Sequence, residues 1–270
     1  MNLRTAILLT DENALLKVHG DTLLEISFYK LREVFDKIFV ITSSPEAQAK
    51  YSKIIMEDVL CDYSERSHPI TQFFTGLKAC QCDKVFLAAS NMPFLNPKAI
   101  KLMGSQEWNR AIVPRYVNGA LEPTHAFYKV KPTLQAVAGA INDERYSFEA
   151  ALLNMDKVNY LPVGELMKVD PQLLTFFKVR SAVDFDTAKA KLNQKVYKGR
   201  LAKAQTLKSS VQIECQSETA VYYKVPGTEE EHEVRFDKRK NSWTCDCTYF
   251  AMKGSYCSHI IAAKEAQDDI

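Results

Sequence analysis

Short apolar runs alternate with amphipathic segments over the first two thirds of the chain. Four runs have the length and composition of buried strands, at residues 5–10, 37–42, 54–60 and 84–89. Between them, residues 23–35 and 71–79 predict helices, and Ser44-Pro45 and Asn96-Pro97 mark two further helix starts. This alternation predicts an α/β domain with a mainly parallel sheet and helices on both of its faces.

The carboxyl ends of the predicted strands are where ligands of such sheets bind. They fall at residues 10–13, 42–44, 60–62 and 90–94. Lys17, His19 and Arg115 are the cations that we expect at this edge, where they would bind an anion such as a nucleotide. His125 lies in a predicted strand and is interpreted as a core histidine rather than as a base.

Cysteine and histidine cluster near the carboxyl end of the chain. Cys245 and Cys247 form one pair, Cys257 and His259 form another, and the apolar run 260–263 predicts a helix that begins at residue 258 or 259. Buried cysteines are common in protein cores, but two closely spaced pairs are a more specific signal. Three thiolates and one imidazole complete the tetrahedral shell of a structural zinc ion. The sequence therefore predicts one Zn²⁺ bound by these four residues.

The same stretch resembles the SWIM zinc finger, in which a Cys-x-Cys pair and a short spacer precede a Cys-x-His pair and a helix. Residues 221–225 and 232–236, joined through Pro226 and Gly227, resemble the strands before the metal site of that family. The resemblance implies a module that binds nucleic acid or protein. We expect this module at residues 211–270, after a large domain at residues 1–192 and a basic linker at residues 193–210.

The stretch VFLAASNMPFLNPKAIKLM, residues 85–103, resembles the MobA-like nucleotidyltransferases, in which a strand leads to an Asp, a variable residue and Pro-Phe before a helix. Further segments follow the family order at residues 13–25, 57–77, 114–128 and 176–184. The resemblance covers residues 3–192. It implies a Rossmann-like fold akin to glycosyltransferase A, and Mg²⁺-dependent nucleotidyl transfer as in the molybdenum-cofactor guanylyltransferases.

The chain departs from this family at several functional positions. The family has a Gly-rich loop after its first strand, whose N–H groups cradle phosphates, whereas residues 10–13 read Thr-Asp-Glu-Asn. Asn13 stands in place of the phosphate-binding Lys, and Asn91 in place of the Asp that binds Mg²⁺. Lys178 and Arg180 replace two Asn residues, and Lys178 would bring a positive charge near the metal position. Asn91 alone is an ordinary turn residue, and Asp11 and Glu12 alone are ordinary solvated loop acids, but together the changes predict a degenerate active site.

Composition adds little on partners, because the formal net charge is only +2. Four cysteines outside the zinc set are irregularly spaced and no secretory segment precedes them, so we interpret them as reduced thiols of a cytoplasmic protein. These are Cys61, Cys80, Cys82 and Cys215. The apolar runs are shorter than the roughly 18 residues of a membrane span, and we expect no membrane partner.

A run of basic residues precedes the zinc motif. Residues 187–210 contain no Asp or Glu and carry Lys189, Lys191, Lys195, Lys198, Arg200, Lys203 and Lys208. Such a run either stays solvated or faces an anionic partner. Arg235, Lys238, Arg239 and Lys240 add further positive charge, and the acidic run 229–231 opposes it.

Two classes of function therefore remain open. In the first, a degenerate MobA-like domain is a scaffold or binding unit, and the zinc module and basic run bind nucleic acid or protein. In the second, the chain is an active Mg²⁺-dependent nucleotidyltransferase with an accessory zinc finger. The glycine-free segment after the first strand and Asn91 favour the first class.

Overall fold

The chain forms two compact units, Met1–Phe185 and Asp186–Ile270. The computed structural model describes residues 5–18, 21–55, 57, 59–228, 230–240, 242–253 and 256–267. The boundary lies within helix α8 (Ala182–Lys208), so residues 193–208 are helical where we expected a linker. This part of the sequence is rich in Ala, Lys, Leu and Gln, which have high helix propensity. The division into domains at residues 1–192 and 211–270 stays a prediction.

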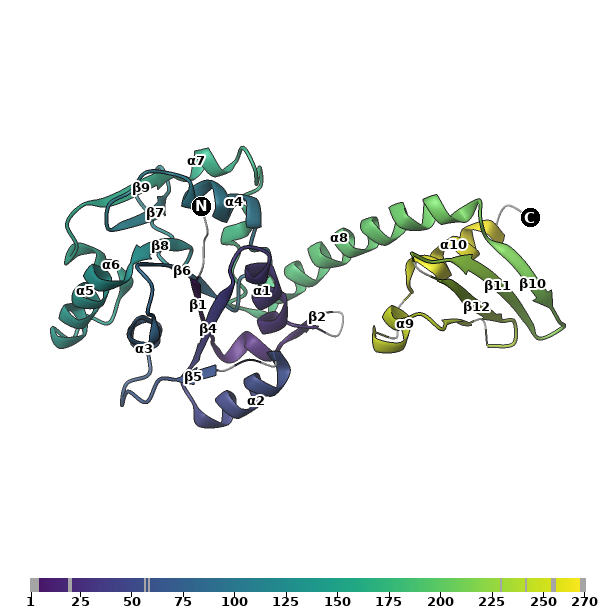
Figure 1. Ribbon diagram of the computed structural model, residues 1–270, viewed down its shortest axis with the longest axis horizontal. Coiled ribbons are helices and arrows are strands. Elements are labelled where there is room, and N and C mark those ends of the chain that lie inside the picture. Colours follow the sequence, from purple (N-terminus) through teal and green to yellow (C-terminus); the bar gives the residue numbers. More distant parts are fainter. Residues whose placement is uncertain are drawn as a thin grey trace. The chain divides into compact units, whose positions relative to one another are not determined.

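A mixed sheet with mainly parallel pairing forms the first unit (Figure 1). Within the described residues its order is β5-β4-β1-β6-β8-β7-β9. Strands β5, β4, β1 and β6 pair in parallel, β8 is antiparallel to its neighbours β6 and β7, and β7 pairs in parallel with β9. The strands are β1 (Thr5–Leu9), β4 (Lys37–Thr42), β5 (Val59–Cys61), β6 (Lys84–Ala89), β7 (Ala111–Arg115), β8 (Ala126–Lys129) and β9 (Val158–Pro162). The predicted α/β class is confirmed.

Helices cover both faces of this sheet, because successive side chains of the buried strands point to opposite sides. In β1, Ala6 and Leu8 join one apolar core, whereas Ile7 and Leu9 join the other. The first core includes residues of α1 (Leu23–Arg32), α2 (Pro45–Ile55), α4 (Pro97–Gly104) and α7 (Val163–Leu166). The second includes residues of α3 (Pro69–Ala79), α5 (Val130–Asn142) and α6 (Phe148–Leu153).

Short elements complete the first unit. They are the 3-10 helices η1 (Glu12–Leu15) and η2 (Leu174–Phe176) and the hairpin strands β2 (Lys17–Val18) and β3 (Asp21–Thr22). The predicted strand at 54–60 is wrong at its start, because Ile54 and Ile55 end helix α2 and the strand begins at Val59. A short apolar run does not distinguish a helix end from a strand, and Ile55 packs in the core from the helix.

The second unit contains an antiparallel sheet of order β10-β11-β12-β13 among its described residues. The strands are β10 (Gln212–Gln216), β11 (Ala220–Pro226), β12 (Glu231–Asp237) and β13 (Ser242–Cys245), and two helices follow, α9 (Thr248–Lys253) and α10 (Ser258–Gln267). Its core includes Tyr223, Val234, Trp243 and Ile260, together with Ala204 of α8. The Trp243 ring stacks on Tyr223 and on Phe236, at centroid distances of 5.6 and 4.6 Å. The two strands predicted before the zinc motif correspond to β11 and β12.

None of the helices that the structure describes is both long enough and apolar enough to span a membrane.

Candidate zinc centre and sheet-edge site

Four potential metal ligands meet in the second unit. Cys245 is the last residue of β13 and Cys247 precedes α9, whereas Cys257 precedes α10 and His259 lies in its first turn. All four side chains are buried, and one ligand atom from each lies within 4.8 Å of the others. Nδ1 of His259 is 3.8 Å from Sγ of Cys245. Ligands of a tetrahedral zinc ion lie about 3.5–3.8 Å apart, given bonds of about 2.0–2.3 Å, so the donor set fits Zn²⁺.

Backbone N–H groups point at the sulfurs of this cluster. Sγ of Cys247 accepts from the N–H of Phe250 and Sγ of Cys257 accepts from the N–H of Ile260, both at 3.4 Å. A hydrogen bond from Cys245 lowers the pKa of the Cys257 thiol, while burial raises the pKa of the Cys247 thiol. Thiolates are the form that binds zinc, so the cluster favours a metal that compensates their buried charge.

A second histidine that the sequence analysis did not single out lies against this cluster. The rings of His232 and His259 have centroids 4.3 Å apart, and Nδ1 of His232 is 3.1 Å from Oδ1 of Asp246. Asp246 lies between two of the cysteines in the sequence. The position of Asp246 inside the Cys-x-Cys pair was the one sequence signal for this contact. The pairing of β12 with β13, which brings His232 to the cluster, could not be predicted from the local sequence.

The second candidate site lies at the carboxyl edge of the first unit's sheet, between β1 and β6. The chain passes from β1 through β4 to β5 and then returns to β6 on the other side of β1, which makes this edge a topological switch point. Asp11 follows β1 and Asn91 follows β6, and Nδ2 of Asn91 donates to Oδ2 of Asp11 at 2.8 Å. The two strand ends are therefore joined at the place where such folds bind ligands.

The closing segment 178–180 also reaches this edge. The N–H of Val179 donates to the carbonyl of Asn91 at 2.9 Å, and the carbonyl of Val179 accepts from Nδ2 of Asn13 at 3.4 Å. Nζ of Lys178 donates to the carboxylate of Glu122 at 2.6 Å, and both side chains are largely buried. The charge that we expected Lys178 to bring near the metal position is thus neutralised by Glu122. The side chain of Arg180 is exposed.

Beside this junction, the strand ends of β1 and β4 border a cavity of about 330 Å³. Asp11 and Glu12 line it, together with Tyr51, His68 and Gln72, and its lining includes no Lys or Arg among the described residues. Burial, and next the charge of Glu12, raise the pKa of Asp11. Each carboxylate would repel a unit charge on phosphate by roughly 4 kcal/mol at about 4 Å and an effective dielectric near 20.

Comparison with known proteins assigns both units. Residues 9–154 match the MobA-like NTP transferase domain, and residues 223–268 match the SWIM zinc finger. The chain belongs to the MobA-like NTP transferase family. Its carboxyl-terminal part is a SWIM zinc finger.

Named relatives agree with this family. A "Probable molybdenum cofactor guanylyltransferase" of Methanosarcina mazei is 27% identical over 68% of this chain and 85% of its own length. A protein of the same name from Natranaerobius thermophilus is 25% identical over 68% of this chain and 89% of its own. The crystal structure of molybdopterin-guanine dinucleotide biosynthesis protein A from Archaeoglobus fulgidus has a TM-score of 0.61, with 19% identity over 70% of this chain and 99% of that one. The last comparison shows a shared fold.

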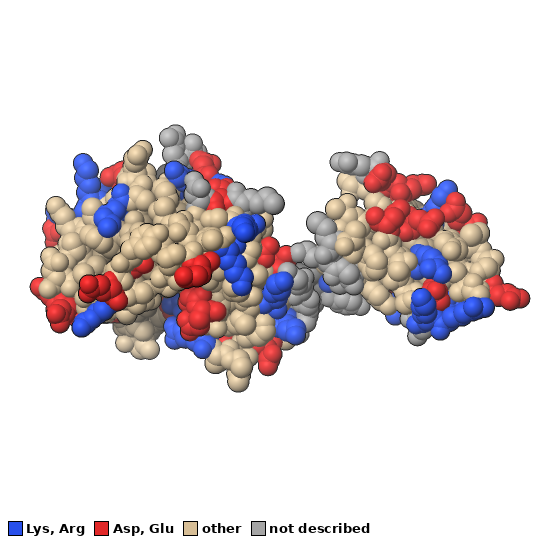
Figure 2. Space-filling model, turned by 90° about the horizontal axis from the view of Figure 1, so that it is seen from below, with Lys and Arg blue, Asp and Glu red and all other residues tan. Residues whose placement is uncertain are grey.

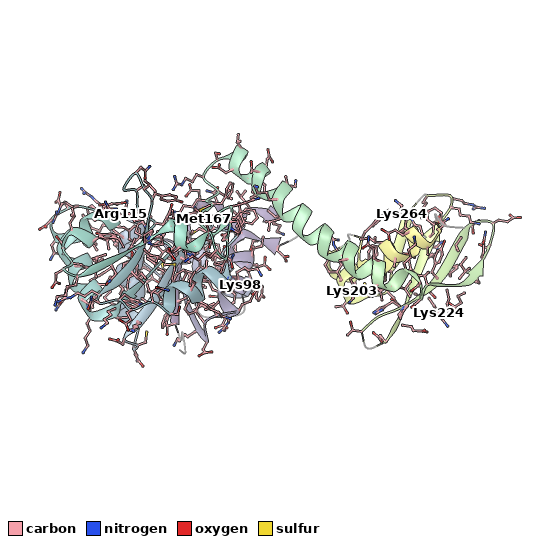
Figure 3. All side chains as sticks on the ribbon, turned by 90° about the horizontal axis from the view of Figure 1, so that it is seen from above. Lys98, Arg115, Met167, Lys203, Lys224 and Lys264 are labelled. Atoms are coloured by element: carbon pink, nitrogen blue, oxygen red, sulfur yellow. The ribbon has the colours of Figure 1, made fainter. Side chains whose placement is uncertain are left out.

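The cations predicted for nucleotide binding lie apart from the sheet-edge cavity. Lys17 belongs to β2, and neither Lys17 nor Arg115 is among the described residues that line the cavity. The guanidinium of Arg115, labelled in Figure 3, lies 5.4 Å from the ring centroid of Tyr160. His19 lies outside the described residues. Nucleotide binding by Lys17 and Arg115 stays a prediction.

His125 has the surroundings of a core histidine. Its side chain is completely buried, the rings of Phe86 and Phe176 meet it edge-on, and Nε2 is 3.4 Å from Oγ1 of Thr175. Burial, assisted by the charge of Lys178, lowers the pKa of His125 to about 3. At neutral pH this imidazole is therefore uncharged, with a proton on one ring nitrogen only, and its role is packing.

Replacement of Cys257 by Ala should abolish the zinc content of the purified protein, which we expect to be one ion per chain. The metal contributes much of the folding free energy of a small module, so the second unit should also unfold at lower temperature. Cys215→Ala is the matched control, because Cys215 is exposed on β10 and is not one of the clustered ligands. Elemental analysis that finds undiminished zinc in the Cys257 variant would contradict the assignment.

Replacement of Asp11 by Asn should change the melting temperature relative to the parent protein in a pH-dependent way. The difference, variant minus parent, should be more positive at neutral pH than at acidic pH. A carboxyl group whose pKa is raised by folding contributes most stability when protonated and loses that contribution as pH rises through its folded pKa. Asn caps a helix as well as Asp does, so the N-cap of η1 should survive the change. Thermal melting at pH 4 and pH 7.5 tests this. A variant whose melting temperature, relative to the parent protein, is lower at pH 7.5 than at pH 4 would show that the Asp11 carboxylate is stabilising.

Proposed function

We propose that this protein is a binding protein in which the MobA-like domain has little or no nucleotidyltransferase activity. The observation that carries this proposal is the hydrogen bond between Asp11 and Asn91 at the switch point. The side chain at the metal position is engaged with a residue of the glycine-free segment. In this arrangement a carboxylate occupies the place where the family resemblance expects backbone N–H groups around phosphate.

Neighbouring contacts support the same proposal. Asn13 donates to the backbone of Val179, and Lys178 is paired with Glu122. These side chains therefore serve contacts within the protein rather than a free anion site. Because metal ions and phosphate-binding groups supply several kcal/mol of transition-state stabilisation, losing both should reduce the rate of transfer by orders of magnitude.

The SWIM zinc finger then makes the macromolecular contact, and nucleic acid is the partner that we favour. Zinc held by Cys245, Cys247, Cys257 and His259 would be structural, because four protein ligands leave no open position. On the face shown in Figure 2, most basic residues of the second unit lie toward its lower edge and most acidic residues toward its upper edge, with one or more residues of the other sign at each edge. A surface region with mainly basic residues suits a polyanion. A protein partner is the other reading of this module.

A second candidate function is Mg²⁺-dependent nucleotidyl transfer, which the curated relatives favour through their name. One feature of the site supports it. Oδ1 of Asn91 is buried and lacks a hydrogen-bond partner among the described groups, and the carboxylate of Asp11 lies beside it. Together they would offer Mg²⁺ two of the oxygen ligands that it prefers, and the ion would neutralise charge on the phosphates of a bound nucleotide.

Pyrophosphate release separates these two candidates. The protein is incubated with Mg²⁺, with GTP or CTP, and with molybdenum cofactor as acceptor. We expect no pyrophosphate release above that of the same mixture without protein. Isothermal titration with the same nucleotides reports whether any of them binds. Pyrophosphate release at about 1 s⁻¹ or faster, within the usual range for enzymes, would overturn the proposal. If the Asp11→Asn variant then lost this release, Asp11 would be assigned as a ligand of the metal.

Nucleic-acid binding by the full chain should fall steeply with salt. With about four to six phosphate contacts, the slope of log affinity against log salt concentration for duplex DNA should be about −4 to −5. Fluorescence anisotropy with duplex and single-stranded oligonucleotides across a salt series measures this slope. Absence of binding at low salt would remove nucleic acid and leave a protein partner, whose binding would depend less on salt and more on exposed aromatic residues such as Tyr256.

A further inference from the structure

A cavity of about 360 Å³ opens beside the zinc ligands of the second unit. Its walls come from α8, from the turn between β11 and β12, and from residues around α9 and the start of α10. Side chains of several chemical types line it, including Arg200, Lys203, Thr228, Tyr249, Ser258 and His259. This cavity is separate from the sheet-edge site of the MobA-like domain.

Two cations line this cavity from one face of α8. Arg200 and Lys203 are three residues apart, which places them on the same side of the helix. Ala204, the next residue, is completely buried in the core of the finger, so this part of α8 is fixed against it. Figure 3 labels Lys203 on this helix. The basic residues are therefore held in place at the cavity rather than on a mobile linker.

Contacts with other parts of the zinc finger hold the side chains of Arg200 and Lys203 in place. The guanidinium of Arg200 lies 5.3 Å from the ring centroid of Tyr249 and donates to the carbonyl of Tyr256. Nζ of Lys203 donates to Oγ1 of Thr228 at 3.4 Å, and an ammonium group has three N–H donors. Glu230 is the carboxylate among the described lining residues, and its side chain is exposed, so solvent screens its charge.

The cavity also receives the amino end of α10. This helix begins at Ser258 and has 10 residues, and both Ser258 and His259 line the cavity. The N–H of Ile260 in this first turn already donates to Sγ of Cys257, so the helix favours an anion mainly through the positive end of its dipole. The helix end adds to the attraction of the two α8 cations.

The strongest indication of a ligand is the unpaired ring nitrogen of His259. The side chain is only 6% exposed, Nδ1 faces the sulfurs, and Nε2 is buried without a hydrogen-bond partner among the described residues. A histidine that binds zinc through one nitrogen carries a proton on the other, and almost always donates it to an oxygen acceptor. Here that acceptor is missing from the described protein groups, and His259 is one of the residues that line the cavity.

We propose that this cavity binds a phosphate group of a nucleic-acid strand. Arg200 and Lys203 supply its countercharge, and a phosphate oxygen accepts the Nε2–H of the zinc ligand His259. This inference rests on the proposed nucleic-acid partner of the SWIM finger and identifies where one phosphate sits. It also couples the ligand to the metal, because an acceptor on Nε2 orients the imidazole and strengthens it as a ligand. Bound phosphate should therefore slow the loss of zinc.

The test measures zinc release from the zinc-loaded, full-length protein into a colorimetric chelator. Inorganic phosphate, a single-stranded oligonucleotide and a duplex are the three probes, and sodium chloride of equal ionic strength is the reference for each. If zinc leaves only after the ligand, release should be about tenfold slower at ten times the dissociation constant of the probe. The oligonucleotide should produce this effect and chloride should not.

Two variants locate the effect. Arg200→Gln combined with Lys203→Gln should weaken oligonucleotide binding about tenfold or more and abolish the slowing of zinc release. Lys264→Gln is the matched control, because it removes one lysine charge from an exposed position on α10 that does not line the cavity. His259→Cys keeps four zinc ligands but removes the Nε2–H, so this variant should retain zinc and lose the response to phosphate.

The outcomes distinguish this inference from the function on which it rests. Oligonucleotide binding that is unchanged in the double variant would overturn the cavity assignment and leave nucleic-acid binding by the finger intact. Slowing by inorganic phosphate alone, without oligonucleotide binding, would assign the cavity to free phosphate and overturn the nucleic-acid partner. Equal slowing by chloride, or retention of the full response in His259→Cys, would overturn the proposed bond to His259.

Discussion

The fold of the second unit depends on how the charge of its buried thiolates is compensated. Three cysteine side chains lie in an apolar core with Trp243 and Ile260, and the imidazole of His259 is also buried. Ionised sulfurs in such a place are unstable without a cation. A zinc ion compensates their charge and joins β13 to the start of α10, which are separated in the sequence. A bound zinc ion would therefore link the small sheet to its helices, and any group that stabilises zinc ligation would also stabilise the fold around it.

At the sheet edge of the MobA-like domain, buried polar and charged groups are also compensated, but by other side chains. Several polar and charged side chains at this edge bond to one another. Asp11 accepts from Asn91, and the buried charges of Lys178 and Glu122 compensate each other. A buried ion pair is tolerated when its partners are well placed, even if it adds little stability. The edge is thus held together by contacts among its own side chains.

Local sequence patterns predicted most of the fold and the complete set of clustered zinc-ligand candidates. Strands such as β1 and β6 are continuous apolar runs, and the spacing of the Cys and His pairs is fixed within a short stretch of chain. Contacts between distant segments were not predictable in this way. Neither the bond from Asn91 to Asp11 nor the packing of His232 on His259 has a local signature, because each depends on strand order. The apolar residues Ile54 and Ile55 were misassigned since a short run fits a helix end and a strand equally well.

The pairing of Lys178 with Glu122 limits which single substitutions this edge of the sheet can accept. A change of Lys178 to the Asn that the family resemblance places there would leave the Glu122 carboxylate largely buried without its partner, which is strongly destabilising. A change of Asn91 to Asp would bring a second carboxylate against Asp11. Single substitutions at these positions are therefore expected to lower the stability of the edge. Lys178 and Glu122 would have to change together, as would Asn91 and Asp11, for the edge to keep its buried charges compensated.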